Sequence, residues 1–113
     1  MLFRSAGDED PGKVAWYTAN SGGASHPVHD LLPNPLRLYD MSGNVAEWVW
    51  DLYGPYAGDA RDPTGAATGE TRVIRGGSYR DPERAIRLAY RKAALPGSRS
   101  PTVGLRLAVI RGP

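Results

Sequence analysis

Residues 38–51 read LYDMSGNVAEWVWD, and this stretch carries most of the information about the fold. Over Val45–Leu52, alternate positions bring Trp48 and Trp50 to the same side of an extended chain. That period of two favours a strand with an aromatic face. The apolar residues also match helical spacing, which is the alternative. The Gly-Asn pair directly before the segment and its β-branched content favour the strand.

Short strands are also expected on either side of this segment. Arg72–Arg75 predicts a strand that a Gly-Gly pair ends or bulges. Apolar residues alternate with polar ones again over 86–90 and over 105–110, which predicts two further strands. Val14–Thr18 is interpreted as a short strand or the wall of a loop. Asp81-Pro82-Glu83 favours a helical turn with proline at its first position.

Glycine and proline make the remaining connections long. The chain has 14 Gly and 10 Pro among 113 residues, and many of them lie within 20–35 and 53–70. The length suits one domain of modest size. We therefore expect an α+β domain of short antiparallel strands and long loops, with little helix, over residues 14–113. Residues 1–13 are mostly polar and are expected to form a flexible lead-in.

Charge and cysteine content exclude several function classes. The net charge is only +2, and the arginines are scattered singly between apolar residues, which argues against a nucleic-acid interface. There is no cysteine, so disulfides and thiol chemistry are excluded. No apolar run is long enough to span a membrane, and no signal-like start is present. We therefore expect a soluble cytoplasmic protein.

Four motifs together resemble the formylglycine-generating-enzyme, or sulfatase-modifying-factor, family. LYDMSGNVAEW resembles the central signature of the family, and RVIRGGSY resembles the motif that follows it. AWYTANSGGASHPV lies upstream and VGLRLA closes the chain, both in the family order. Arg37 and Leu105 depart from the usual Gly and Phe. The resemblance implies a C-type-lectin-like fold and covers the C-terminal half of the family domain, so the chain is alternatively a fragment of a longer protein.

The resemblance also implies a structural calcium ion in the central turn. Its ligands would be the Asp40 and Glu47 carboxylates and the Gly43 and Val45 carbonyls. Calcium prefers six to eight hard oxygens of this mixed kind. The alternative is that Asp40 caps the turn and Glu47 pairs with an arginine. A second family calcium site would lie near Asn20, its one obvious ligand.

Family catalysis uses two cysteines and copper to oxidise a substrate cysteine. Aligned from Tyr79, the cysteine positions hold Asp81 and Ile86. Cu(I) selects thiolate ligands, so the resemblance implies that copper is not a cofactor here and that the chain alone does not generate formylglycine. A related branch uses histidines to bind iron. His26 and His29 are the only histidines, and a structural role is preferred for both.

Other reactive-looking residues have simpler interpretations. Ser78 follows two glycines but lacks the surroundings of a nucleophile elbow, and we expect it to satisfy loop backbone. The arginines between apolar residues are expected to be solvated or ion-paired, with a pocket for an anionic or peptide ligand as the alternative.

We therefore expect a non-catalytic, calcium-stabilised module that binds a peptide or protein partner. The alternative is a fragment or half of a formylglycine-generating oxidase, or of a related metal-dependent oxidoreductase, whose remaining site is supplied elsewhere. Whether the chain is an enzyme therefore stays open. Exposed strand edges would also favour association into a homo-oligomer or marginal stability.

Overall fold

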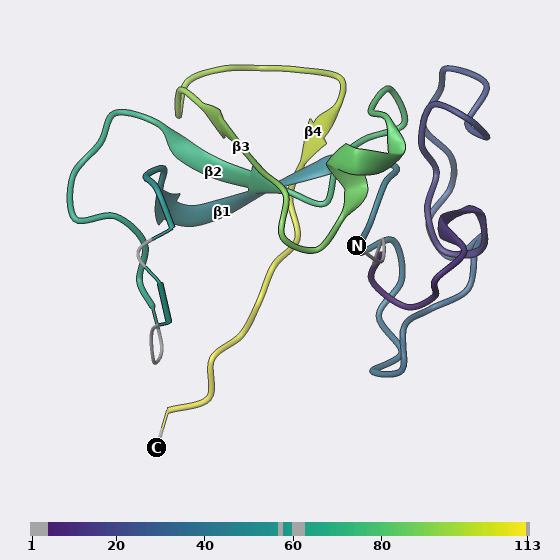
Figure 1. Ribbon diagram of the computed structural model, residues 1–113, viewed down its shortest axis with the longest axis horizontal. Helices are drawn as coiled ribbons and strands as arrows, with labels where there is room; N and C mark the ends of the chain where they lie inside the picture. The colour runs from purple at the N-terminus through teal and green to yellow at the C-terminus, as the bar shows by residue number, and fades with distance from the viewer. Residues whose placement is uncertain (1–4, 57, 60–62, 113) are drawn as a thin grey trace.

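A four-stranded sheet forms the centre of the protein, as a computed structural model shows (Figure 1). The structure describes residues 5–56, 58–59 and 63–112. The strands lie in the order β3-β2-β1-β4, and a layer of loops formed by the first forty or so residues lies beside them. The elements are η1 (Pro11–Lys13), β1 (Ala46–Leu52), β2 (Arg72–Arg75), η2 (Glu83–Ile86), β3 (Arg91–Ala94) and β4 (Val103–Gly104).

The predicted central strand is confirmed as β1. It pairs antiparallel with β2, with Trp48 opposite Ile74, and the register then shifts before Leu52 meets Arg72. An irregularity of this kind bends and twists the strand locally. Trp50 lies within the shifted stretch and is 83% exposed, so the predicted aromatic face is only partly buried. The guanidinium of Arg72 lies 4.6 Å from its ring centroid.

The strand predicted at Arg72–Arg75 is confirmed as β2, which also pairs antiparallel with β3. The strand predicted over residues 86–90 is wrong. Ile86 ends the 3-10 helix η2, and the chain then turns, with the Tyr90 amide donating to Arg87, before β3 begins. Packing explains the difference, because Ile86 is fully buried in the core and this fixes the turn around it.

The strand predicted over residues 105–110 is also absent. Only Val103–Gly104 pairs with the sheet, as the parallel edge strand β4 beside β1. The chain then leaves the body as an extended segment (Figure 1). Alternation identified an extended conformation here, but alternation alone does not supply a neighbouring strand.

The core joins the loop layer to the end of η2. Val14 and Ala15 pack with Ile86 at 0–2% exposure, and Tyr17 covers them from the side. Val14–Thr18 is therefore a loop wall and not a strand. Alpha helix is absent from the described residues, so the predicted loop-rich fold with short antiparallel strands and little helix is confirmed.

Backbone hydrogen bonds join the loop layer to the sheet. The Asn44 amide donates to the Trp16 carbonyl over 2.7 Å, and the Gly43 amide donates to Gly76 over 2.8 Å. The Tyr79 amide donates to the Asn44 carbonyl over 2.8 Å. The turn before β1 is therefore held between the two parts of the molecule.

The first residues of the expected lead-in, 1–4, lie outside the described residues. Within the remainder, Ser5 is buried and the Ala6 amide donates to the Ser42 hydroxyl. Asp10 caps η1 through the Gly12 amide, and Pro11 occupies its first position. In the described part of the chain, no helix has the length and apolar character of a membrane span.

Candidate functional site

The turn from Asp40 to Glu47 has an unusual backbone. Asp40, Gly43 and Asn44 all have positive φ, at 54°, 75° and 65°. Asn44 secures the turn with its side chain, which accepts from the His26 amide over 2.9 Å and donates to the His26 carbonyl over 3.1 Å. Asn and Asp tolerate this left-handed region better than most residues do. The sequence of the turn therefore suits its conformation.

Asp40, Gly43, Val45 and Glu47 all line one cavity of about 330 Å³, so the structure brings the four predicted calcium ligands together. Asp40 is 9% exposed, and its Oδ2 accepts from the His29 amide over 3.1 Å. Its Oδ1 is buried and has no hydrogen-bond partner among the described residues. A buried carboxylate oxygen without a donor is costly, and a water molecule or a cation in the cavity would satisfy it.

Glu47 is held by an arginine from the end of the chain. The Nε atom of Arg106 donates to both oxygens of Glu47 over 3.0 Å, and Nη2 lies 2.8 Å from Oε1. Nη2 also donates to the carbonyls of Tyr39 and Asp40, over 2.8 and 3.1 Å. The hydrogen bonds to Glu47 raise the pKa of Arg106 above its usual value. The guanidinium therefore supplies the positive charge on one side of the cavity.

The donor set suits a hard cation but is incomplete. Two carboxylates and two backbone carbonyls are the oxygen types that calcium selects, and the remaining coordination positions would fall to water. Among the described residues, no cluster of three or more acidic or histidine side chains that could hold a metal ion is present, so an ion here would depend on backbone carbonyls as well. The unpartnered Asp40 Oδ1 is the observation that favours a cation, whereas the Arg106–Glu47 pair competes for one ligand.

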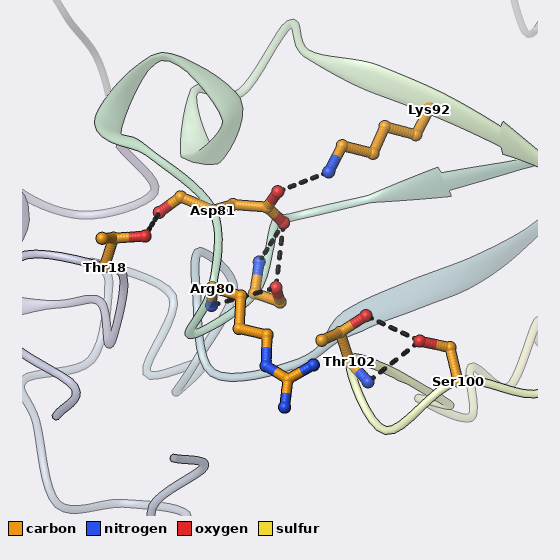
Figure 2. A network of polar contacts seen from close by, with 7 residues as sticks. Thr18, Arg80, Asp81, Lys92, Ser100 and Thr102 are labelled. Carbon is orange, nitrogen blue, oxygen red and sulfur yellow. Dashed lines mark hydrogen bonds and ion pairs between the residues drawn. The ribbon is translucent and has the colours of Figure 1, made fainter. Parts of the chain in front are cut away.

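Asp81 is at the centre of a polar network that joins three segments (Figure 2). Its Oδ2 accepts from the amide and the hydroxyl of Ser78 over 2.8 and 2.9 Å. Its other oxygen is ion-paired with Lys92 on β3, and its carbonyl accepts from the Thr18 hydroxyl. Both carboxylate oxygens therefore have structural partners, and the Ser78 hydroxyl is used to satisfy this loop.

Ile86 occupies the second position that the resemblance assigns to a catalytic cysteine. Its side chain is fully buried between Val14 and Ala15. A residue in this place contributes to the core and has no contact with solvent. Asp81 thus forms an ion pair, and Ile86 is part of the hydrophobic core.

The two histidines have separate structural contacts. The His26 ring stacks on Trp16 with centroids 3.8 Å apart, and its Nε2 lies 2.7 Å from the Ser21 carbonyl. The His29 ring lies against Tyr39 with centroids 4.3 Å apart. They do not belong to a common cluster of metal-ligating side chains in the described chain.

Asn20 was the expected ligand of a second calcium site. Its amide oxygen accepts from the Tyr17 amide, and its amide nitrogen donates to the Ala15 carbonyl, both over 2.9 Å. The side chain therefore closes its own turn in the structure.

A second cavity of about 250 Å³ lies beside β1. An arginine-lined pocket was the alternative that the sequence left open, without a position for it. Met41, Trp48 and Leu88 supply apolar walls, and Arg75 and Arg87 also line the cavity. Arg75 donates to the Leu88 carbonyl over 2.9 Å, so it is a fixed part of the wall. An apolar groove with fixed guanidinium groups suits a peptide side chain and its backbone carbonyls.

The sequence did not identify Arg106, His29 and Leu105 as parts of the first cavity, which the structure shows them to line. The available signal was the closing motif VGLRLA. Its place in the family order did not indicate a contact with residues 59 to 67 positions earlier. The sequence offered an arginine partner for Glu47 as the alternative to calcium, and the structure shows this pairing, with Arg106 as the partner.

Comparison with known proteins gives a consistent result. Residues 5–110 match the family described as Sulfatase-modifying factor enzyme 1-like domain. The chain is 40% identical over 98 residues to a formylglycine-generating enzyme of Streptomyces coelicolor and 42% identical over 81 residues to the serine/threonine-protein kinase pkn1 of Chlamydia pneumoniae. The solved structure of Treponema denticola variable protein 1 matches with a TM-score of 0.82 at 35% identity.

In each case the match covers most of this chain and a minority of the relative. It covers 80% of this chain and 31% of the Streptomyces enzyme, and 67% and 13% for the kinase. For the Treponema structure the shares are 90% and 40%. The resemblance found in the sequence is confirmed, and with it the C-type-lectin-like fold.

Proposed function

Because the chain belongs to the family of sulfatase-modifying factor enzyme 1-like domains, we propose that it is a non-catalytic, calcium-stabilised module that binds a peptide or protein partner. The observation that carries this proposal is the use of the two cysteine-equivalent positions. Asp81 is hydrogen-bonded to Ser78 and ion-paired with Lys92, and Ile86 is packed in the core. Neither supplies the thiolate that Cu(I) selects.

The calcium part of the proposal rests on the cavity beside the central turn. Asp40 and Glu47 would hold the ion with their carboxylates, and Gly43 and Val45 with their carbonyls. Bound calcium would supply positive charge to the unpartnered Asp40 Oδ1 and fix the backbone of the turn. Because the same turn bonds to Trp16 and Tyr79, fixing it would stabilise the contact between the loop layer and the sheet.

The binding part of the proposal is supported by the variety of the relatives. Matching proteins are named as a protein kinase, a formylglycine-generating enzyme and a variable protein. One domain type shared by differently named proteins is typical of a scaffold whose surface is adapted to different tasks. The apolar cavity beside β1, with Arg75 on its wall, is the surface that we assign to a peptide.

The alternative is that the chain is part of a formylglycine-generating oxidase whose remaining site is supplied elsewhere. The 40% identity to the Streptomyces enzyme favours this alternative. Mass spectrometry of a cysteine-containing peptide, incubated with the chain, Cu(I) and oxygen, tests catalysis by the chain alone, and conversion to formylglycine overturns the non-catalytic proposal. Unchanged cysteine is expected from both, so the incubation is repeated with the N-terminal part of the Streptomyces enzyme added: conversion then supports the alternative, and unchanged cysteine supports the non-catalytic proposal.

Thermal unfolding in calcium and in EDTA tests the ion site. A ligand present at a hundred times its Kd raises the free energy of unfolding by about 2.7 kcal/mol. For a domain of this size, each kcal/mol shifts Tm by roughly 4–8 °C. We expect calcium to raise Tm by about 10 °C or more, and Asp40→Asn to remove most of this rise, because the neutral amide is a weaker ligand.

Asp30→Asn is the matched control, since Asp30 is exposed and does not line the cavity. It is expected to keep the full response to calcium. A Tm that is the same in calcium and in EDTA would overturn the calcium part of the proposal. The peptide-binding part would remain. Equal loss of the response in both variants would show that the effect is a general one of surface charge.

A further inference from the structure

The ion pair of Glu47 and Arg106 is shared by the two cavities. Both residues line the cavity beside the central turn, and both also line the second cavity beside β1. The Nε atom of Arg106 donates to both oxygens of Glu47, and Nη2 donates to the carbonyls of Tyr39 and Asp40. A change in this pair therefore alters the proposed calcium site and the surface that we assign to a peptide at the same time.

The guanidinium and a calcium ion have the same requirement, because each needs the carboxylate of Glu47. Calcium lies about 2.3–2.6 Å from its oxygen ligands. Arg106 already contacts both oxygens of Glu47, with Nη2 2.8 Å from Oε1. An ion bound there would meet the guanidinium at close range, where two positive charges repel each other. We therefore expect each cation to weaken the binding of the other.

The surroundings of the pair favour the ion over the guanidinium. Arg106 satisfies Glu47, but the buried Oδ1 atom of Asp40 has no hydrogen-bond partner among the described residues. An ion that contacts both carboxylates gives that oxygen a positive ligand. The side chains of Arg106 and Glu47 are 36% and 21% exposed, and water weakens an ion pair that it reaches. We therefore expect the release of Arg106 to cost less than the ion gains.

We propose that Arg106 is a built-in competitor of the calcium ion, which holds Glu47 in the ion-free chain and leaves it when the ion binds. This inference rests on the calcium part of the proposed function. Among the described residues, Arg106 makes all the side-chain hydrogen bonds of the segment 105–112, so its release detaches this segment from the central turn. Because Arg106 and Ala108 line the second cavity, calcium binding also changes the wall of that cavity.

Isothermal titration calorimetry with calcium chloride tests the competition. We expect Arg106→Gln to bind calcium about tenfold or more tightly than the wild type, because affinity rises with the number of carboxylates that are free to bind. Arg111→Gln is the matched control. It removes the same charge from the same segment, and Arg111 is exposed and lines neither cavity. Its Kd is expected to stay within about twofold of the wild-type value, because salt screens a distant charge.

The outcomes separate this inference from the calcium site itself. Calcium binding in the wild type that is equal or weaker in Arg106→Gln would overturn the competition but keep the site, since Arg106 would then only position Glu47. Binding in Arg106→Gln with none in the wild type would support the competition. No binding in either protein would overturn both the competition and the calcium site.

A spin label tests the release in a chain that keeps Arg106. Leu107→Cys introduces a single cysteine for a nitroxide beside Arg106, at a residue that is 85% exposed and lines neither cavity. We expect calcium to narrow the electron paramagnetic resonance spectrum of this label, because the released segment moves more freely. The same label at Leu36→Cys, where the native residue is 78% exposed in the loop layer, is expected to keep its spectrum. An unchanged spectrum at residue 107 in saturating calcium would overturn the proposal.

Discussion

At the residue scale, the two positions that the family pattern assigns to cysteines have structural roles in this chain. Asp81 and Ile86 lie only five positions apart and have opposite surroundings. The aspartate joins Ser78 to Lys92 through its two oxygens, whereas the isoleucine is fully buried. Replacing either residue therefore removes a structural contact, and restoring a thiol at these positions would disturb the fold before it could supply any chemistry.

Tyr17 provides a pH-dependent test of the small core. Its ring packs against Val14, Ala15 and Ile86, and burial, together with the charges of nearby carboxylates, raises the pKa of its phenol above 10.0. The folded state therefore keeps the proton at a pH where the unfolded chain has lost it. Stability is fully present below pH 10.0 and falls as the pH rises beyond it.

We accordingly expect the free energy of unfolding in urea to fall as the pH rises above about 10, and to fall less in Tyr17→Phe. Tyr39→Phe is the matched substitution, because the Tyr39 hydroxyl makes no hydrogen bond in the described part of the chain, and it is expected to show the wild-type fall. An equal fall in the wild type and in Tyr17→Phe would contradict the assignment.

At the scale of elements, the turn before β1 depends on a glycine that no other residue can replace. Gly43 has a φ of 75°, and a Cβ there would lie 2.4 Å from the Trp16 carbonyl oxygen. That oxygen is held by the Asn44 amide, so it cannot move freely. We expect Gly43→Ala to lower the free energy of unfolding by about 4 kcal/mol or more, measured by urea denaturation.

Gly23 separates the two contributions to that loss. Its φ is 78°, nearly the same as that of Gly43, but a Cβ there meets no atom within 4 Å. Gly23→Ala should therefore show the backbone cost alone, about 1–2 kcal/mol. If the two substitutions cost the same, the close approach of Trp16 has no energetic effect.

The strands that could be predicted from the sequence are those that find partners nearby. β1 was recognised from its alternation and from the Gly-Asn pair before it, and β2 from the Gly-Gly pair that follows it. The same alternation at 86–90 and 105–110 led to wrong strand predictions. A period of two indicates an extended chain but does not show whether another strand pairs with it. At Ile86 burial overrode the local pattern, and after Gly104 no strand in the described chain lies beside the segment.

On the scale of the whole molecule, the candidate site combines residues that a sequence motif identified with a residue that only the structure assigned to the site. The carbonyls and carboxylates of the central turn are close in sequence, so a motif identifies them. Arg106 is 59 positions from Glu47, and its contact depends on β4 pairing with β1. Charge and spacing predict that Glu47 needs a cation but do not identify which arginine provides it.

Hydrogen bonds between the loop layer and the sheet predict that the two parts unfold as one unit. The amides of Thr18, Asn44 and Tyr79 all bond across this contact, and the buried Ser21 hydroxyl donates to the Tyr79 carbonyl over 2.8 Å. Hydrogen exchange should therefore give these three amides one common slow rate. Ser21→Ala should speed all three equally, because it leaves a buried carbonyl without its donor and costs about 1–3 kcal/mol.

The matched control is Ser25→Ala, in the same loop but exposed, which should leave the three rates unchanged. Faster exchange at Thr18 than at Tyr79 would show that the loop layer opens by itself. The central turn would then belong to the mobile part, and calcium binding would be expected to slow exchange at Thr18 more than at Tyr79. Equal rates would place the turn, the core and the sheet in one cooperative unit, so that any ligand of the turn stabilises the whole domain.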